Sequence, residues 1–299
     1  MKPAQRRRLP GFALALPAWL WLFVFFLVPV AVVFWYSFGY KPGLFGTHAN
    51  DVLSFDRYAE VFTPTFFDTF RNTLWIGVAG TLLCFVIGAP IAYWMALKAP
   101  ANLKGLLIAL VLVPFWTNFL VRTIGWMVVL SPEGWLSTAL QSLGFEPFSI
   151  LHTRSAVLFG VVYNYLPLMI LPLFVAFDRV GEVVREASKD LGATPVRTFM
   201  RVTFPLARPG IVVGVLLVYI PLMGDYITAT VLGGAKGNMV GQMLASQFQT
   251  AQNWALGSAM AIMLILMITL SIAAMAVLAW LISLPFRYQN RVRLEGVPA

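Results

Sequence analysis

Long apolar runs alternate with short polar stretches along the whole chain. Six of these runs are long enough to cross about 30 Å of hydrocarbon as helices. We place them at residues 12–38, 72–97, 105–130, 155–177, 209–232 and 256–284. Because a backbone in lipid must satisfy its own hydrogen bonds, helices are the expected form for runs of this length. The pattern therefore predicts an all-α integral membrane protein with six transmembrane helices.

The first apolar run follows a basic stretch, Lys2 to Arg8, which on its own would also suit a secretory or twin-arginine signal. The run at 12–38 is too long for the apolar region of a cleaved signal, so we expect a retained first helix. Residues 1–11 are then a short tail before that helix.

Composition supports a membrane location. The chain has 299 residues, of which 60% are hydrophobic and 11% are charged, whereas soluble domains carry about 25% charged residues. The net charge of +9 would suit a nucleic-acid partner, but the charges lie in short stretches between apolar runs. We therefore expect membrane lipid, and no nucleic acid, around this chain.

Lysine and arginine are distributed unevenly between the two sides of the predicted bundle. Fifteen lie in the N-terminal tail, the 98–104 turn, the 178–208 loop and the C-terminal tail, and four lie in the opposite loops, namely Lys41, Arg57, Arg154 and Lys236. The bias predicts that both tails, 1–11 and 285–299, and the 178–208 loop are cytoplasmic. Segment 39–71 is then an acidic outer, periplasmic segment. Residues 131–148 are expected to form a short amphipathic helix on the same side.

Residues for bond chemistry are missing from the sequence. The Gly233–Gly237 stretch lacks the Lys-Ser/Thr pair of a phosphate-binding loop. The two histidines, His48 and His152, and the single Cys84 form no spaced ligand set. We predict no catalytic residues, no metal and no cofactor bound by this chain, which would not be an enzyme. Energy for any transport must come from a partner or an ion gradient.

The polar loop at 180–208 carries a distinct pattern. Residues 180–191 can form a helix with Val183, Val184, Ala187 and Leu191 on one side. Gly192 can end this helix in a left-handed conformation, and Thr194-Pro195 can start a second one as N-cap and first residue. Pro205 and Pro209 are expected to break the second helix. The alternative is that residues 180–208 form only a solvated polar connector between two spans.

The same loop resembles the Glu-Ala-Ala loop of permeases from ABC importers. Glu186, Ala187, Ser188, Gly192 and Pro205 occupy the matching positions, with Ser188 in place of the second alanine. The resemblance implies that residues 180–208 couple the permease to an ATPase. It implies an ABC type-1 permease core at 72–284 and four partner chains: two copies of the ATPase subunit, a second homologous permease and a periplasmic substrate-binding protein. ATP and Mg would be used by the ATPase.

A second set of motifs is similar to polyamine permeases. These are Pro114-Phe115-Trp116-Thr117, Leu120-Val121-Arg122-Thr123, Tyr163-Asn164-Tyr165-Leu166-Pro167, Gly224-Asp225-Tyr226-Ile227-Thr228 and Gln252-Asn253-Trp254. The resemblance covers about residues 12–287 and implies import of putrescine or spermidine across a bacterial inner membrane. Importers of opines, amino-butyrate and other amines share much of the pattern, so the solute stays open.

Two charged residues, Arg122 and Asp225, lie inside predicted spans, where ionised groups usually face a bundle interior or water. Counted along straight helices, both lie about 24–26 Å from the cytoplasmic edge. We hypothesise that Asp225 lines the substrate path and meets a cationic solute, while Arg122 orders the outer gate. The alternatives are a structural salt bridge, or an Arg122 side chain that reaches the headgroups.

Aromatic and helix-breaking residues surround the same predicted path. The aromatic residues can make cation–π contacts with an amine, or belong to an interfacial aromatic belt; they are Trp116, Trp126, Tyr163, Tyr165 and Tyr226. Pro221 and Gly224 are expected to break the fifth helix before Asp225, and Pro167 and Pro172 to break the fourth. Gly210 and Gly214 predict close helix packing.

Two further classes of protein compete with the importer. An ion-coupled carrier or channel would need acids at matched depths in several spans, and only Asp225 is present. An integral-membrane enzyme would need a nucleophile or a metal cluster. Co-purification with an ATPase separates the importer from both.

Overall fold

The computed structural model describes residues 11–43, 45–146 and 149–289, and within them the regular structure is helical, with one isolated bridge between Tyr40 and Ala49. Of the predicted tails, 1–11 and 285–299, residues 1–10 and 290–299 lie outside the described residues. The chain divides into two compact units, one formed by residues 64–245 and one by residues 1–63 with 246–299.

The all-α prediction is confirmed. Five helical stretches are long and apolar enough to span a membrane: Ala15–Tyr36, Pro64–Leu97, Arg154–Asp178, Pro195–Met223 and Trp254–Leu281. A sixth candidate is a bent pair, Ala101–Trp116 with Phe119–Ser142. The described part of the chain therefore has up to six spans, as the apolar pattern predicts.

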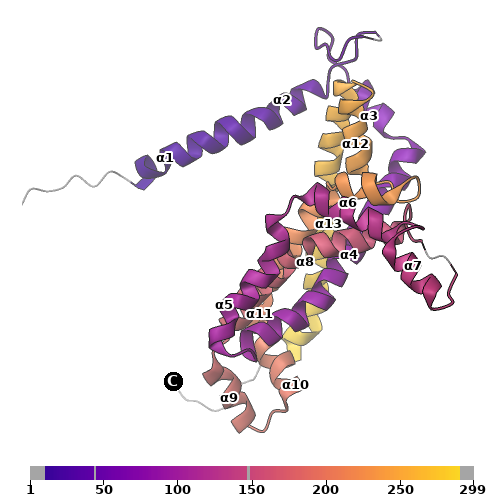
Figure 1. Ribbon diagram of the computed structural model, residues 1–299. Helices are drawn as coiled ribbons and strands as arrows, with labels where there is room; N and C mark the ends of the chain where they lie inside the picture. The colour runs from indigo at the N-terminus through magenta and orange to yellow at the C-terminus, as the bar shows by residue number, and fades with distance from the viewer. Residues whose placement is uncertain (1–10, 44, 147–148, 290–299) are drawn as a thin grey trace, which may run out of the picture. The chain divides into compact units, whose positions relative to one another are not determined.

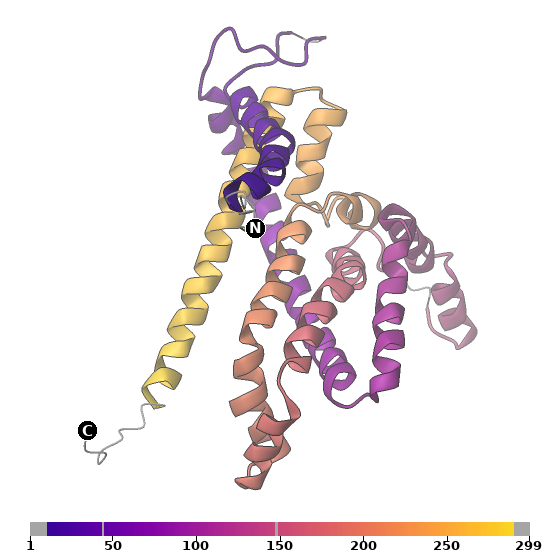
Figure 2. The ribbon, with the colours of Figure 1, turned by 90° about the vertical axis from the view of Figure 1, so that its left-hand side faces the viewer.

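Three helices form the centre of the 64–245 unit. Helix α4 (Pro64–Leu97) packs along α8 (Arg154–Asp178), and α8 packs along α11 (Phe204–Met223). Figures 1 and 2 show α8 and α11 running side by side. Buried apolar side chains of all three helices make the core, among them Ile76, Met169, Leu173 and Leu222.

Helix α4 begins earlier than the apolar pattern predicts. The predicted outer segment 39–71 ends in helix, because Pro64 starts α4 and the charged Asp68 and Arg71 lie in its first two turns. Both side chains are exposed. They form an ion pair along the helix, with an Nη of Arg71 3.5 Å from Oδ1 of Asp68. A helix of 34 residues is about 51 Å long, so its charged end extends beyond about 30 Å of hydrocarbon.

The predicted span 105–130 is wrong in form. Helix α5 (Ala101–Leu112) and the 3-10 turn Val113–Trp116 stop at Thr117, and α6 (Phe119–Leu130) starts in a new direction, so that the two halves are bent by 85°. Thr117 and Asn118 are extended and make the bend, while Pro114 lies in the 3-10 turn before it. Asn118 then caps α6, because its side chain accepts the N–H of Leu120 at 2.8 Å.

Prolines elsewhere do not act as predicted. Helix α8 runs unbroken through Pro167 and Pro172, and Pro205 and Pro209 lie within the continuous helical stretch Pro195–Met223. A π-helical turn at Phe199–Thr203, where the N–H of Phe204 reaches the carbonyl of Phe199, precedes Pro205. Such local changes of hydrogen-bond register, together with packing, let helices in membranes carry proline.

The fifth predicted span is broken just before Asp225, as Pro221 and Gly224 predict. Helix α11 stops at Met223, Gly224 makes a turn, and a new helical segment continues to Gly233. The predicted span 209–232 is therefore displaced, because the helix starts at Pro195 and ends at Met223.

Short helices complete this unit. The predicted amphipathic helix at 131–148 is α7 (Trp135–Ser142), with Leu136 half-buried against the core and Trp135 exposed. Helices α9 (Glu182–Asp190) and α10 (Pro195–Thr198) lie together beyond the ends of α8 and α11 (Figure 1). Helix α12 (Val240–Gln249) follows the π-helical turn Ala229–Gly233.

The other unit contains the first and last predicted spans. Its N-terminal span comprises α1 (Gly11–Leu22), the π-helical turn Phe23–Leu27 and α2 (Val28–Tyr36). Helix α13 (Trp254–Gln289) packs against α2 and against α3 (Asp56–Val61), and it runs past the predicted end at 284. The loop at 39–55 joins α13 through the N–H of Trp254, which donates to the carbonyl of Thr47 at 3.2 Å.

Candidate functional site

The predicted coupling loop folds as a helix, a turn and a second helix. Gly192 has a φ of 80°, the left-handed conformation that suits glycine after a helix. Its N–H donates to the carbonyl of Lys189 at 2.8 Å. Thr194 then caps α10 by accepting the N–H of Arg197 at 3.4 Å, and Pro195 is the first helical residue. Gly192, Thr194 and Pro195 thus act locally as the sequence predicts.

Ser188 joins the two helices of the loop. Its hydroxyl lies 3.1 Å from the hydroxyl of Thr198, a residue of α10 that is buried. An alanine at this position could not make this hydrogen bond. The serine therefore links α9 to α10 and helps to set the angle between them.

The apolar side of α9 is open to solvent in the isolated chain. Val183 is 78% exposed and Leu191 is 90% exposed, and Val184, Val196 and Met200 are exposed as well. Exposed apolar side chains gathered on one short helix and its neighbour are typical of a surface that contacts another protein or a membrane. We call Val183, Val184, Ala187 and Leu191 the α9 face. Glu186, three residues after Val183 and so at the border of this face, is exposed, and Pro205 is half-buried.

Asp225 is buried, with 6% of its surface exposed, and it caps the helical segment that follows it. One carboxylate oxygen accepts the N–H of Thr228 at 3.0 Å, and the other accepts its hydroxyl at 2.6 Å. This is the geometry of a helix N-cap. Reasoning from charge and depth alone missed this role, although the spacing Asp-x-x-Thr in the sequence could have indicated it.

Arg122 lies in the first turn of α6, directly after the bend. Its guanidinium stands over the rings of Phe115 and Phe119, at 5.5 Å and 5.7 Å from their centroids. Two of its nitrogens, Nε and one Nη, are buried without a hydrogen-bond partner within the part of the chain that the structure describes. Because the chain turns by 85° at residues 117–118, the depth predicted for Arg122 along a straight helix is wrong.

Arg122 and Asp225 form no ion pair with each other or with any other residue between 15 and 281 that the structure describes. The structural salt bridge that was one alternative is thus not present between them. Asp225 is held instead by Thr228, and Arg122 by aromatic rings.

The aromatic candidates are only partly brought together. Trp126 of α6 packs edge-on against Phe159 and Tyr163 of α8, with centroid distances of 4.6 Å and 5.1 Å. Trp116 is 82% exposed at the bend, and Tyr226 is exposed beside Asp225. The six predicted path residues therefore do not form a single cluster.

Further polar side chains are buried around α8, among them Asn164 and the predicted aromatic residue Tyr165. Asn164, 2% exposed, donates from Nδ2 to the hydroxyl of Thr123 at 3.2 Å, and its Oδ1 has no partner in the described residues. The hydroxyl of Tyr165 points to the carbonyl of Pro221 at 3.5 Å. A buried amide in an apolar span is costly unless it is bonded, which is a signal that could have been used.

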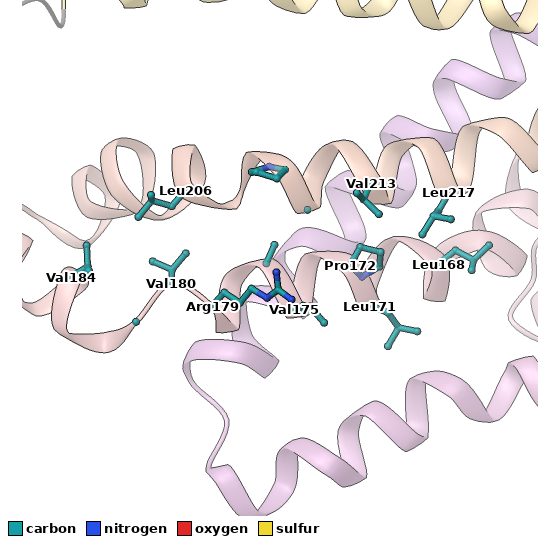
Figure 3. A pocket seen from close by; sticks show the side chains of 14 residues that line it. Leu168, Leu171, Pro172, Val175, Arg179, Val180, Val184, Leu206, Val213 and Leu217 are labelled. Carbon is teal, nitrogen blue, oxygen red and sulfur yellow. The ribbon is translucent and has the colours of Figure 1, made fainter. Parts of the chain in front are cut away.

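An apolar groove runs along α8 and α11 from the level of α9 towards the middle of both helices. Its volume is about 690 Å³. Leu168, Leu171, Pro172 and Val175 of α8 line one wall, and Leu206, Pro209, Val213 and Leu217 of α11 line the other (Figure 3). Arg179, Val180 and Val184 surround the end nearest α9.

A comparison with known proteins identifies the family of this chain. Residues 88–283 match the model of the family described as binding-protein-dependent transport system inner membrane component. The chain belongs to this family. It is therefore a membrane component of a transport system and not an enzyme.

Curated relatives match most of the chain. The spermidine/putrescine transport system permease protein PotB of Escherichia coli strain K12 is 36% identical over 246 residues, which are 82% of this chain and 88% of that protein. PotB of Haemophilus influenzae strain Rd is 39% identical over 254 residues, which are 84% of this chain and 88% of that protein.

Solved structures share the fold. A chain of a bacterial ABC transporter that imports the acidic polysaccharide alginate matches with a TM-score of 0.68 and 14% identity, over 87% of this chain and 91% of that chain. A chain of the MetNI methionine ABC transporter matches with a TM-score of 0.55 and 18% identity, over 71% and 95%. The chain thus has the fold of a permease from an ABC importer.

Proposed function

We propose that this chain is a permease subunit of an ATP-driven importer that carries putrescine or spermidine across the bacterial inner membrane. The observation that carries the proposal is the identity of 36–39% to PotB proteins over more than four fifths of both chains. The motifs around Trp116, Arg122, Tyr163 and Asp225, which resemble polyamine permeases, point to the same solutes.

The α9 face is the surface on which we propose that an ATPase subunit docks. Apolar side chains as exposed as Val183 and Leu191 favour burial against a partner, at about 25 cal/mol for each Å² removed from water. Glu186, Ala187, Ser188, Gly192 and Pro205 belong to the helix-turn-helix that holds this face. The Ser188–Thr198 hydrogen bond would pass a movement of α9 to α10 and on to α11.

The proposed complete importer has this chain, a second homologous permease, two ATPase subunits and a periplasmic substrate-binding protein. One solved relative, an alginate ABC transporter, is in complex with a periplasmic protein that holds an alginate pentasaccharide. ATP and Mg would be bound by the ATPase subunits, while this chain would hold neither.

The proposed orientation places both termini and the α9–α10 loop in the cytoplasm. The 178–208 loop alone carries six basic residues, Arg179, Arg185, Lys189, Arg197, Arg201 and Arg208. Basic residues near the ends of spans favour the cytoplasmic side. An ATPase in the cytoplasm could then reach the α9 face.

Asp225 is the residue that we propose to meet the cationic solute. A carboxylate that is 6% exposed and has no ion-pair partner among the described residues is costly unless a cation approaches it or it takes up a proton. An ammonium group of a polyamine would supply that cation. Trp126, Tyr163 and Tyr226 would contribute aromatic faces, and Trp116 and Arg122 would border the path at the bend.

Alternating access follows from this arrangement as a mechanism. Closure of the ATPases on ATP would move α9 and α10, and the helix that runs from Pro195 to Met223 would carry the movement to the break at Gly224. Asp225 lies directly beyond this break. The solute released by the binding protein would enter beside Asp225 and leave on the cytoplasmic side.

The proposal is tested by uptake of radiolabelled putrescine and spermidine in cells that lack this chain, with its neighbouring subunits intact. We expect uptake to be lost and to return with the wild-type chain. If deletion instead abolishes uptake of another amine or an opine, the chain is a permease of the same architecture that carries a different solute. Uptake that follows an ion gradient without an ATPase would favour a carrier.

A further inference from the structure

The apolar groove between α8 and α11 is as long as one leaflet of a bilayer. Along α11 it runs from Leu206 to Leu217 (Figure 3), which is about 17 Å at 1.5 Å per residue. Half of the hydrocarbon thickness of about 30 Å is about 15 Å. The groove therefore reaches from the membrane surface near α9 to about the middle of the bilayer.

The lining of the groove suits a hydrocarbon chain. Every side chain that lines it is apolar except that of Arg179, so an apolar occupant loses no hydrogen bond to polar groups along its length.

A positive charge lies at the α9 end of this groove. Arg179 lines it beside Val180, and its side chain lies among the groove residues in Figure 3. The acid next to it, Asp178, is already paired with Lys104 of α5, with Nζ and Oδ1 2.6 Å apart. Among the described residues Arg179 has no ion-pair partner, so its charge is available to a ligand.

We propose that this groove binds an anionic phospholipid of the cytoplasmic leaflet. One acyl chain lies between Val175 and Val213, and the phosphate contacts Arg179. Basic sites between transmembrane helices on the cytoplasmic side recognise anionic headgroups in this way. The leaflet assignment rests on the orientation given under the proposed function, whereas the lipid contact itself does not depend on which solute is carried.

Lipid retention tests the proposal. The complex that contains this chain is purified in mild detergent from a membrane rich in phosphatidylglycerol and phosphatidylethanolamine, and retained lipids are counted by mass spectrometry. We expect Val213→Trp, which fills the groove, to lower retained phosphatidylglycerol at least threefold. The matched control is Val212→Trp, because Val212 is exposed to a similar degree, 57% against 48%, but does not line the groove.

The headgroup contact is tested by Arg179→Gln. We expect this variant to lose its preference for phosphatidylglycerol over phosphatidylethanolamine, while Arg197→Gln, on the exposed helix α10, keeps it. Equal retention in Val213→Trp and Val212→Trp, or in Arg179→Gln and Arg197→Gln, would overturn the proposal. These experiments measure bound lipid and not solute uptake. A negative result would therefore refute lipid binding in the groove without bearing on the proposed transport function.

A photoreactive residue separates lipid from protein as the occupant. A diazirine-bearing amino acid in place of Leu217, at the inner end of the groove, should form adducts with phospholipid in native membranes. This crosslinking experiment also tests the proposal if a tryptophan variant does not fold. Adducts mainly with a polypeptide, whether the second permease or another helix of this chain, would contradict the lipid assignment.

Discussion

Among single residues, backbone conformation was more predictable than side-chain partnership. Gly192, Thr194 and Pro195 behave as their chemistry dictates, because a helix end depends on a few neighbouring residues. The contacts of Asp225 and Arg122, two charged residues within predicted spans, were not foreseen. Asp225 bonds to Thr228, and Arg122 stacks on Phe115 and Phe119.

Gly192 offers a prediction about the coupling turn. Its φ of 80° is strained for any residue with a Cβ, although no atom lies within 4 Å of that position. We expect Gly192→Ala to cost about 1 kcal/mol in the turn and to lower ATP-driven uptake severalfold without loss of membrane insertion. Gly181→Ala is the control, because its Cβ also meets open space but its φ is −51°. Equal uptake by the two variants would show that the turn is not needed.

Asp225 offers a prediction about the solute path. Asp225→Asn keeps an oxygen that can accept the N–H of Thr228, so the helix start should persist, while the charge is removed. We expect polyamine uptake to fall about tenfold or more, equivalent to about 1.4 kcal/mol. Asp68→Asn, an exposed acid in the first turns of α4, should leave uptake unchanged. Wild-type uptake by Asp225→Asn would reduce Asp225 to a helix cap.

Among the helices, hydropathy located the spans but not their bends. Four prolines expected to interrupt helices, Pro167, Pro172, Pro205 and Pro209, lie inside continuous ones, whereas the predicted span 105–130 bends at residues 117–118, where no proline stands. Proline removes a hydrogen bond in every case. Whether the helix ends there depends on neighbouring helices and on local π-helical turns, which apolar periodicity does not record.

The α9 face offers a prediction about a whole helix. Leu191→Ser removes an exposed apolar side chain that is 90% open in the isolated chain, so it should leave folding unchanged. We expect the amount of ATPase that co-purifies with the chain to fall at least fivefold. Lys189→Ser, on the opposite side of α9, should retain the ATPase. If both variants hold it equally well, the ATPase docks elsewhere.

For the molecule as a whole, the sequence indicated an all-α bundle but not its packing. Close helix packing was expected from Gly210 and Gly214 and is confirmed, and the structure shows that α8 is the partner helix. A Cβ on Gly210 would overlap Ala176, and a Cβ on Gly214 would lie 3.1 Å from the sulfur of Met169. The central position of α4 against α8, and the ion pair of Lys104 with Asp178, join residues far apart in the chain and leave no local signal.

The close contact between α8 and α11 can be tested by adding a single methyl group at Gly210. Gly210→Ala should push α8 and α11 apart and cost about 1–3 kcal/mol, visible as a lower melting temperature in detergent. Gly105→Ala, where the added Cβ meets nothing within 4 Å, should be neutral or slightly stabilising, since alanine favours helix over glycine. Equal melting temperatures would contradict the tight contact.

In the proposed mechanism, this chain passes solute through a path that is driven from the α9 face. The most direct measurement is ATP-dependent uptake of radiolabelled spermidine into vesicles that contain the purified complex, with the wild-type chain or with Leu191→Ser. We predict uptake that requires ATP and the binding protein and that is lost in Leu191→Ser, while Lys189→Ser transports normally. Uptake without ATP, or full ATP-driven uptake by Leu191→Ser, would contradict this mechanism.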